Sequence, residues 1–354
     1  MQAYCVAMEK EIRAMAKAYP QAKVSTVFLG GGTPTLVPAA AMEGVLRALR
    51  ECFDFLPDAE FTSEGNPGTV TKQWLDTALK YGLNRLSLGV QAAQQPLLQT
   101  LGRIHTFEDA EKAVRLARGC GVNNLNLDAM FGLPGQTEKD YLDTLAAFRQ
   151  LDAQHISAYS LILEEGTPLY TMVEQGRLHL PDEDETAAMY EHGIEWLEKA
   201  GYARYEVSNF ARKGFECRHN IGYWQGEWYL GMGVAAHSML PPAEKDAFCL
   251  RKGNACDVQA YIMALQSGSP APVESAEHIT REDAMFEAMM LGLRTTAGVD
   301  GTRFAQRFGQ TLRQRYGAQL DTLVRDDLGM WTDAGFTLTP RGIEVQNEVL
   351  MRLM

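Results

Sequence analysis

The chain has 354 residues, and 33 Lys and Arg stand against 45 Asp and Glu, for a formal net charge of −12 at pH 7. This acidic balance argues against a nucleic-acid partner, because phosphate contacts need a basic surface. No apolar run approaches the roughly 18 residues of a membrane span. The six cysteines are scattered and no signal peptide is evident, which favours reduced thiols in a cytoplasmic protein.

The first 19 residues predict an amphipathic helix. Strand-like runs and helical patterns then alternate along the chain. The runs are KVSTVFLG (23–30), EFTSEGNP (60–67), NRLSLGVQ (84–91), NNLNLDAMFGLP (123–134) and HISAYSLI (155–162). Thr106 with Asp109, and Thr137 with Asp140, predict capping boxes at the starts of two helices. The alternation predicts an α/β protein with a parallel sheet, either a barrel or a doubly wound sheet.

Polar or glycine-rich segments follow the carboxyl ends of several predicted strands. They are 30–33, Glu64 with Asn66, Gln91 and Asp128. In a parallel sheet these ends share one rim, where ligands bind, although such residues also cap helices and shape turns. GGGTPT lacks the Lys of a phosphate-binding loop, and Thr35 stands where a dinucleotide fingerprint has its third glycine. Open backbone beside a carboxylate instead suits a zwitterionic, cationic ligand, with Glu64 accepting from a ribose diol.

The motifs FLGGGTPT, EGNP, SLGVQ, LGRIHT, NLDAMFGLPGQT and EEGTPLY occur in this order. Together they resemble the radical S-adenosylmethionine family of oxygen-independent coproporphyrinogen oxidases and their relatives. The resemblance implies a partial parallel (β/α) barrel over residues 1–265 and a mainly helical, winged-helix-like domain over 280–354. It also implies the residues that bind S-adenosylmethionine, which are Gly31, Gly32, Thr33, Glu64, Gln91, Arg103 and Asp128.

The family carries a [4Fe–4S] cluster on three cysteines spaced C-x3-C-x2-C. None of the six cysteines here has that spacing, so the chain as written lacks the cluster ligands. We expect an N-terminally incomplete copy in which the cluster loop and the first barrel strand are absent. The alternative is a degenerate, cluster-free member that keeps only the binding pocket.

The stretch 215–239 gathers histidines and aromatic residues that could stack on a macrocycle and ligate its iron. For His237 a packed corner is an equally good interpretation. His219, Asn220, Tyr223 and Trp224 match the H-N-x-x-Y-W signature, which resembles the haem-chaperone group of this family, the HemW group. The haem candidates are His219 as the first choice of iron ligand, Cys217 as the alternative, and Tyr223 and Trp224.

From about residue 280 the sequence predicts helices, a short hairpin and a closing helix, with 266–277 as a linker. Met285, Phe286, Met289, Met290 and Leu293 form an apolar face that is typical of a core. A winged helix invites a DNA-binding interpretation. However, from Arg281 onward nine arginines and no lysine stand against ten acidic residues, so we expect a structural or lid-like module.

The resemblance therefore implies a haem chaperone that binds haem and S-adenosylmethionine and delivers haem to membrane-bound respiratory proteins. One alternative is an enzyme, an oxygen-independent coproporphyrinogen III oxidase (dehydrogenase) of porphyrin biosynthesis. The other is a cluster-free binding module. A homodimer is compatible with the sequence, but no segment specifies its interface.

Overall fold

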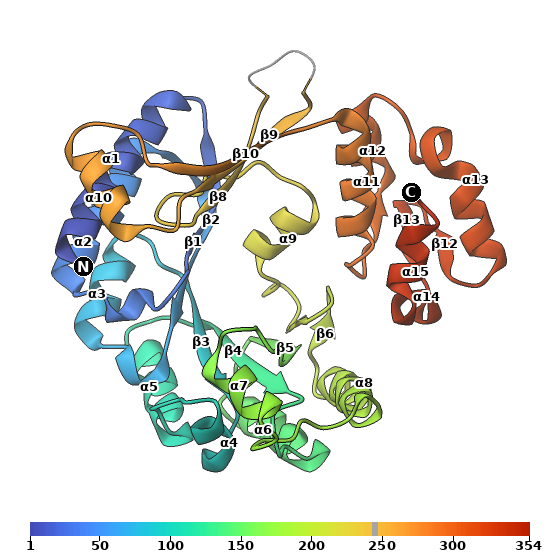
Figure 1. The fold of residues 1–354 in the computed structure, drawn as a ribbon, viewed down its shortest axis with the longest axis horizontal. Helices are drawn as coiled ribbons and strands as arrows, with labels where there is room; N and C mark the ends of the chain where they lie inside the picture. The colour runs from blue at the N-terminus through green and yellow to red at the C-terminus, as the bar shows by residue number, and fades with distance from the viewer. Residues whose placement is uncertain (243–246) are drawn as a thin grey trace. The chain divides into compact units, whose positions relative to one another are not determined.

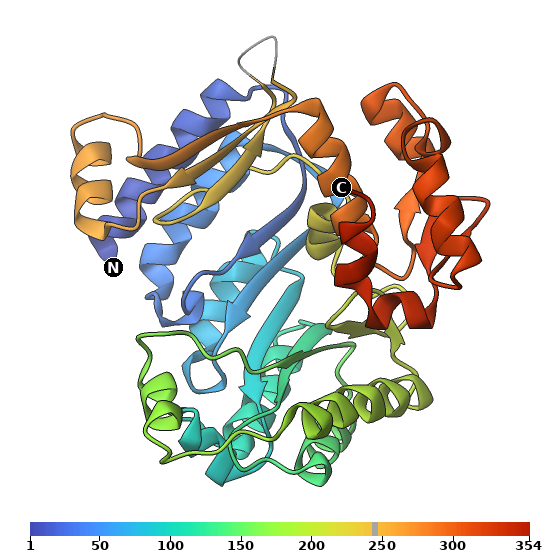
Figure 2. The same cartoon turned by 45° about the vertical axis from the view of Figure 1, so that its right-hand side comes forward.

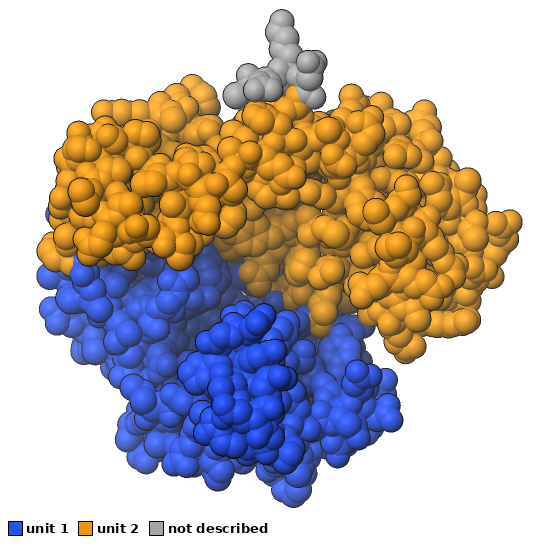
Figure 3. Space-filling view, in the orientation of Figure 1, with its two compact units in different colours: residues 1, 23–204, 208–217 blue, residues 2–22, 205–207, 218–354 orange. Residues whose placement is uncertain are grey.

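The computed structural model describes residues 1–242 and 247–354. The chain forms two compact units, coloured separately in Figure 3. Unit 1 comprises Met1, Lys23–Arg204 and Ser208–Cys217, and unit 2 comprises Gln2–Ala22, Tyr205–Val207 and Arg218–Met354. The domain boundaries expected from the sequence, 1–265 and 280–354, stay a prediction.

Unit 1 contains a seven-stranded sheet in the order β1-β2-β3-β4-β5-β7-β6. Its parallel part holds the five predicted strands, which are β1 (Lys23–Leu29), β2 (Asp54–Gly65), β3 (Arg85–Gln91), β4 (Asn124–Phe131) and β5 (His155–Ser160). The short strands β7 (Asn209–Ala211) and β6 (Ala203–Arg204) add antiparallel pairs. From β1 to β5, strands that follow one another in the chain are parallel neighbours in the sheet, which is the arrangement of a β/α barrel. The sheet curls into a half-barrel (Figure 2).

Helices follow the parallel strands, as the sequence predicts (Figure 1). They are α2 (Ala39–Cys52), α3 (Lys72–Lys80), α4 (Gln95–Thr100), α5 (Phe107–Gly119), α6 (Glu138–Gln150), α7 (Pro168–Glu174) and α8 (Glu183–Lys199). The predicted capping boxes at Thr106 with Asp109 and at Thr137 with Asp140 are confirmed. Each one satisfies backbone N–H groups at a helix start, so these residues fix where α5 and α6 begin.

The strands of unit 1 alternate between two kinds of side chain. In β3, Leu86, Leu88 and Val90 are fully buried apolar residues. The intervening positions carry polar groups, Arg85 and Ser87, which are also buried. Because successive side chains point to opposite faces of a strand, one face of the sheet is apolar and the other is polar. Of the candidate site residues, Glu64, Gln91 and Asp128 lie on these strands.

Unit 2 begins with α1 (Gln2–Ala18), which packs against α10 (Val258–Gln266). The strands β8 (His237–Leu240) and β9 (Cys249–Asn254) lie between these helices in the chain, and β10 (Val273–Ile279) follows α10. The three strands form an antiparallel sheet in which β9 pairs with both β8 and β10. The interpretation of 266–277 as a linker is wrong from Val273 onward, because β10 pairs with β9 along its length. All but one of the β10 side chains are exposed, so the strand has no apolar alternation to reveal it.

The C-terminal part of unit 2 is mainly helical, as expected. It consists of α11 (Arg281–Gly292), β11 (Val299–Asp300), α12 (Gly301–Phe308), α13 (Leu312–Arg325), β12 (Gly329–Trp331), β13 (Gly335–Leu338), α14 (Pro340–Glu344) and α15 (Gln346–Met351). Met285, Met289 and Leu293 are buried in its core, which confirms the predicted role of this apolar face. In the part of the chain that the structure describes, no helix has the length and apolar character needed to cross a membrane.

Candidate functional site

The glycine loop after β1 exposes bare backbone. Gly31 and Gly32 have φ angles of +76° and +120°, a region that disfavours residues with a side chain. A Cβ atom added at either position would meet no atom within 4 Å. The loop therefore presents main chain to open space, where a ligand can approach it closely. Thr33 follows as the N-cap of the short 3-10 helix η1 (Pro34–Leu36).

Glu64 lies next to this loop, near the end of β2. Its carboxylate accepts a hydrogen bond from the backbone N–H of Gly31. A Cβ atom at Gly30 would lie only 3.1 Å from the Glu64 carboxyl carbon, so glycine at this position gives the carboxylate room. Burial raises the pKa of Glu64, the negative charge of Asp128 raises it further, and the Gly31 N–H lowers it.

Asp128 is held by a buried network centred on Asn126, two residues earlier on β4. The Asn126 amide nitrogen donates to Asp128 Oδ1 at 2.6 Å and to Ser87 Oγ at 2.7 Å. Its oxygen accepts from His155 Nδ1 at 2.6 Å and from Ser157 Oγ at 3.2 Å. Burial lowers the pKa of His155 well below its ordinary value, so the ring is neutral and carries its proton on Nδ1.

Desolvation opposes the ionisation of Asp128. Burial raises its pKa to about 6, while the Asn126 hydrogen bond and the positive charges of Arg85 and Arg103 lower it. A cation bound beside Asp128 and Glu64 would lower both pKa values, because it stabilises the carboxylates in their charged form. The pair is therefore suited to a positively charged ligand.

Gln91 and Arg103 complete the cluster. Gln91 is buried at the end of β3 with φ +75°, and its Oε1 accepts from the Tyr159 hydroxyl at 2.9 Å. Burial raises the pKa of Tyr159 as it raises that of Asp128, and the positive charge of Arg103 opposes both shifts, which places Arg103 near these groups. His105 fixes the loop that carries Arg103, because its Nε2 donates to the Val90 carbonyl at 3.2 Å.

The structure thus brings Gly31, Glu64, Gln91, Arg103 and Asp128 together at the carboxyl rim of the parallel strands. Gly32 and Thr33 belong to the same loop as Gly31. Sequence reasoning missed the supporting residues, which are Arg85, Asn126, His155 and Tyr159. A signal existed, because strands of a parallel sheet are usually apolar on both faces, and β3, β4 and β5 carry polar residues at most alternate positions.

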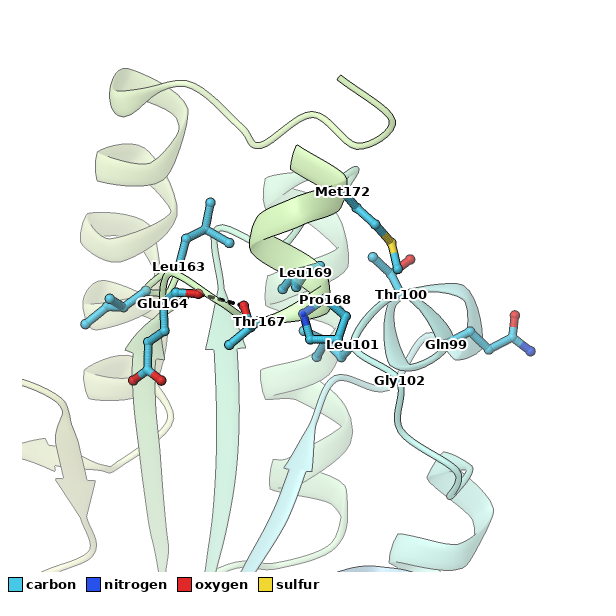
Figure 4. A pocket seen from close by; sticks show the side chains of 11 residues that line it. Gln99, Thr100, Leu101, Gly102, Leu163, Glu164, Thr167, Pro168, Leu169 and Met172 are labelled. Atoms are coloured by element: carbon cyan, nitrogen blue, oxygen red, sulfur yellow. Dashed lines mark hydrogen bonds between the residues drawn. The ribbon is translucent and has the colours of Figure 1, made fainter. Parts of the chain in front are cut away.

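A cavity of about 410 Å³ lies beside this rim, within unit 1 (Figure 4). Its walls come from the end of α4 with Leu101 and Gly102, and from the segment 162–172, which includes the first residues of α7. Leu163, Leu169 and Met172 make part of the lining apolar. The predicted site residues do not line it, although Arg103 directly follows Gly102.

The haem candidates fall into two different environments. His219, Tyr223 and Trp224 lie on α9 (Arg218–Trp224) in unit 2. His219 and Tyr223 are four residues apart, so they share one helix face. His219 Nε2 lies 3.0 Å from the Tyr223 hydroxyl, and the two rings meet edge to face at 4.7 Å. Tyr223 is 42% exposed and makes a second edge-to-face contact with Tyr229.

Cys217 belongs to unit 1 and has no exposed surface. Its thiol donates to Glu60 Oε1 at 3.4 Å. An iron ligand must be reached by the macrocycle, and a thiol in this position is covered by the protein. Of the two ligand candidates, His219 is therefore the more accessible in this structure.

Comparison with known proteins gives two family matches. Residues 8–148 match the model of the Radical SAM superfamily, and residues 279–345 match the model of the HemN C-terminal domain. The heme chaperone HemW of Bacillus subtilis is 37% identical over 351 residues, which cover 98% of this chain and 89% of that protein. The heme chaperone HemW of Haemophilus influenzae is 37% identical over 345 residues, which cover 97% and 86%.

Among solved structures, the coproporphyrinogen III oxidase HemN from Escherichia coli matches with a TM-score of 0.80. The match covers 99% of this chain and 82% of that chain at 24% sequence identity. At this identity the likeness concerns the fold. It confirms the predicted fold class, a partial β/α barrel with a mainly helical C-terminal part.

A radical SAM protein is expected to use S-adenosylmethionine and a [4Fe–4S] cluster. The rim residues fit the first, since open glycine backbone and two carboxylates suit a zwitterionic sulfonium nucleoside. They do not fit the second. Within residues 1–242 and 247–354, no three His, Cys, Asp or Glu side chains gather as a metal site, and the sequence has no C-x3-C-x2-C. We therefore assign no chemical step to a cluster on these residues.

The relatives extend over nearly the whole chain at more than 30% identity. Both family models and the fold agree with this relationship. The chain belongs to the HemW group of the radical SAM superfamily.

Proposed function

We propose that this chain is a haem chaperone, which binds haem at α9 and passes it to a membrane-bound respiratory haem protein. The observation that carries this proposal is the pairing of His219 with Tyr223 on one face of α9. An imidazole is a common axial ligand of haem iron, and an aromatic ring beside it can pack on the macrocycle. Relatives named heme chaperone HemW support the same function.

Tyr223 has a defined part in this proposal. Its hydroxyl holds one ring nitrogen of His219, and its ring meets the imidazole edge to face, so both contacts fix the orientation of the ligand. Its exposed surface is available to an apolar macrocycle, because Tyr can bury its ring while its hydroxyl keeps a polar partner.

S-adenosylmethionine would bind at the rim of unit 1. When bound, it supplies a sulfonium cation and a source of methionyl and adenosyl groups. In our proposal Gly31 and Gly32 let its methionyl end approach the backbone, and Glu64 accepts from its ribose hydroxyls. Asp128 and Gln91 offer acceptors, and Arg103 offers a fork of donors to a carboxylate.

Coproporphyrinogen III oxidation has no residue-level support here, since the likeness to HemN at 24% identity concerns the fold. A cluster-free binding module keeps the rim but gives no reason for the His219–Tyr223 pair. A cytoplasmic location, a respiratory recipient and a homodimer stay predictions.

Haem transfer tests the proposal directly. Purified chain is titrated with haem, freed of unbound haem, and mixed with apomyoglobin as a probe acceptor. The proposal predicts a stoichiometric complex whose Soret band moves to that of myoglobin on mixing. A chain that binds no haem, or that turns over coproporphyrinogen III under anaerobic reconstitution, would contradict it.

A further inference from the structure

The segment after α9 forms a tight turn that ends the helix. The Gly226 N–H donates to the Tyr223 carbonyl, and the Glu227 N–H donates to the Gly222 carbonyl, both at 2.9 Å. Gly226 has φ +64°, a conformation that favours glycine. The turn is thus tied by its backbone to the same helical turn that carries Tyr223.

Arg303, on α12 in the C-terminal part of unit 2, forms two hydrogen bonds with this turn. Its Nη1 donates to Gln225 Oε1 at 2.6 Å, and its Nη2 donates to Glu227 Oε1 at 3.0 Å. One planar guanidinium therefore binds two side chains that flank Gly226. Such a fork fixes geometry more strictly than a single point charge would.

Arg307 lies one helical turn further along α12 and reaches the same place. Its Nη1 donates to the Gln225 carbonyl at 3.4 Å, and its guanidinium packs 5.4 Å from the Phe248 ring and 5.3 Å from the Phe308 ring. A Cβ atom at Gly226 would lie 2.2 Å from Arg307 Nη1. Glycine is therefore favoured at position 226 by its backbone angle, and a side chain there would displace the Arg307 guanidinium.

The aromatic side of α9 is anchored as well. The Tyr223 ring contacts Tyr229 at 4.7 Å, and Tyr229 packs against the core that α11, α12 and α13 share with β8 and β9. Tyr229 is also paired with Met239 of β8 through two backbone hydrogen bonds. The helix that carries His219 is thus held at its carboxyl end by α12 and along its aromatic face by Tyr229.

We propose that Arg303 and Arg307 are positioning residues for haem binding, through which the C-terminal helical part orients α9 and its ligand His219. This inference rests on the proposed function. It gives the C-terminal part a role in haem recognition that needs no contact between its arginines and haem. Because coupling is reciprocal, bound haem must in turn strengthen the grip of α12 on the turn.

The test compares Arg303→Ala with Arg313→Ala in the full chain. Arg313 is a matched control, since it also pairs with a carboxylate, Asp321, and stacks on an aromatic ring, Trp331, but it lies on α13 away from the turn. Amide hydrogen exchange of Gly226 and Glu227 is measured without haem. Haem affinity and the Soret maximum are measured by titration, and thermal unfolding shows whether each variant is folded.

For Arg303→Ala we expect faster exchange at both amides, about three- to tenfold weaker haem binding and an altered Soret band, since the ion pair is partly exposed. Arg303→Lys should restore part of the affinity, and Arg313→Ala should match the parent chain. Unchanged exchange in Arg303→Ala would contradict the claim that Arg303 stabilises the turn after α9. Faster exchange with an unchanged haem spectrum and affinity would overturn the positioning role.

Failure of the proposed function is distinguishable from failure of this inference. If the parent chain binds no haem, the haem assignment fails, and the positioning role fails with it. The exchange experiment still reports independently whether α12 holds the turn.

Discussion

Burial raises the pKa of Glu64 on β2, and the carboxylate of Asp128 on β4 lies close enough to raise it further. The strand between them, β3, pairs with both, so the two acidic groups flank one strand at the same rim. Two negative charges held together in a partly desolvated place are unfavourable without a counter-charge. A cationic ligand supplies that charge, which makes the pair a pH-dependent binding element.

We predict that S-adenosylmethionine binds more weakly as the pH falls below about 6. The pKa of Asp128 is raised to about 6, so the carboxylate that attracts the sulfonium is protonated below that value. Calorimetric titration between about pH 7.5 and about pH 5.5 measures this, with Asp128→Asn as the variant that loses the pH dependence. Equal affinity across the range would count against Asp128 as a ligand contact.

The buried Asp128 carboxylate should lower the free energy of unfolding at neutral pH. The unfolded chain loses this proton near the ordinary pKa of 3.8, while the folded chain holds it until about 6. Folding stability from this group therefore falls as the pH rises through that interval and stays lower above it. We predict that Asp128→Asn raises the free energy of unfolding at neutral pH by the order of 1–3 kcal/mol. Urea unfolding at about pH 7.5 and about pH 4 tests this, because the gain should vanish at the lower pH.

Asn126 should behave in the opposite way. Its amide bonds Asp128, Ser87, His155 and Ser157 at once, so its removal takes one hydrogen bond from each of these groups. We predict that Asn126→Ala lowers the free energy of unfolding by about 2–4 kcal/mol. The exposed Asn123→Ala is the control and should change it by less than about 0.5 kcal/mol. Equal unfolding curves for the two variants would refute the network.

The role of the glycine loop after β1 can be tested by comparing two Gly→Ala variants. Gly31→Ala must adopt φ +76° with a side chain, which costs about 1 kcal/mol, and it puts a methyl group where the ligand approaches. Gly119→Ala meets the same open space, but within helix α5, so it should stabilise by about 0.5–1 kcal/mol. Chemical unfolding and S-adenosylmethionine titration separate the two, since only Gly31→Ala should lose affinity.

Much of unit 1 could be predicted from sequence because its signals are local. Apolar strands bounded by Gly and Pro, and Thr-x-x-Asp caps, each depend on a few neighbouring residues, and they gave the order and type of β1 to β5 with α5 and α6. The rim residues followed, because parallel strands place their carboxyl ends together. The motif resemblance implied which of them bind S-adenosylmethionine, and that assignment stays a prediction.

The residues that sequence reasoning missed depend on partners distant in the chain. In the sequence, Asn126 is one of several polar residues in a predicted strand. Only the pairing of β4 with β5 places His155 and Ser157 beside it. Likewise Val273–Ile279 has no apolar alternation, and only its pairing with β9 makes it a strand. The grip of Arg303 on the turn after α9 joins residues 76 and 78 positions apart, which no local pattern reveals.

Haem titration of His219→Ala beside His237→Ala tests the central claim most directly. His237 is an exposed histidine on β8, so its variant controls for adventitious imidazole binding. The account predicts that the parent chain and His237→Ala give the same one-to-one Soret band, while His219→Ala loses it or shifts it with at least about tenfold weaker binding. A His219→Ala variant with the parent's spectrum and affinity would contradict the account.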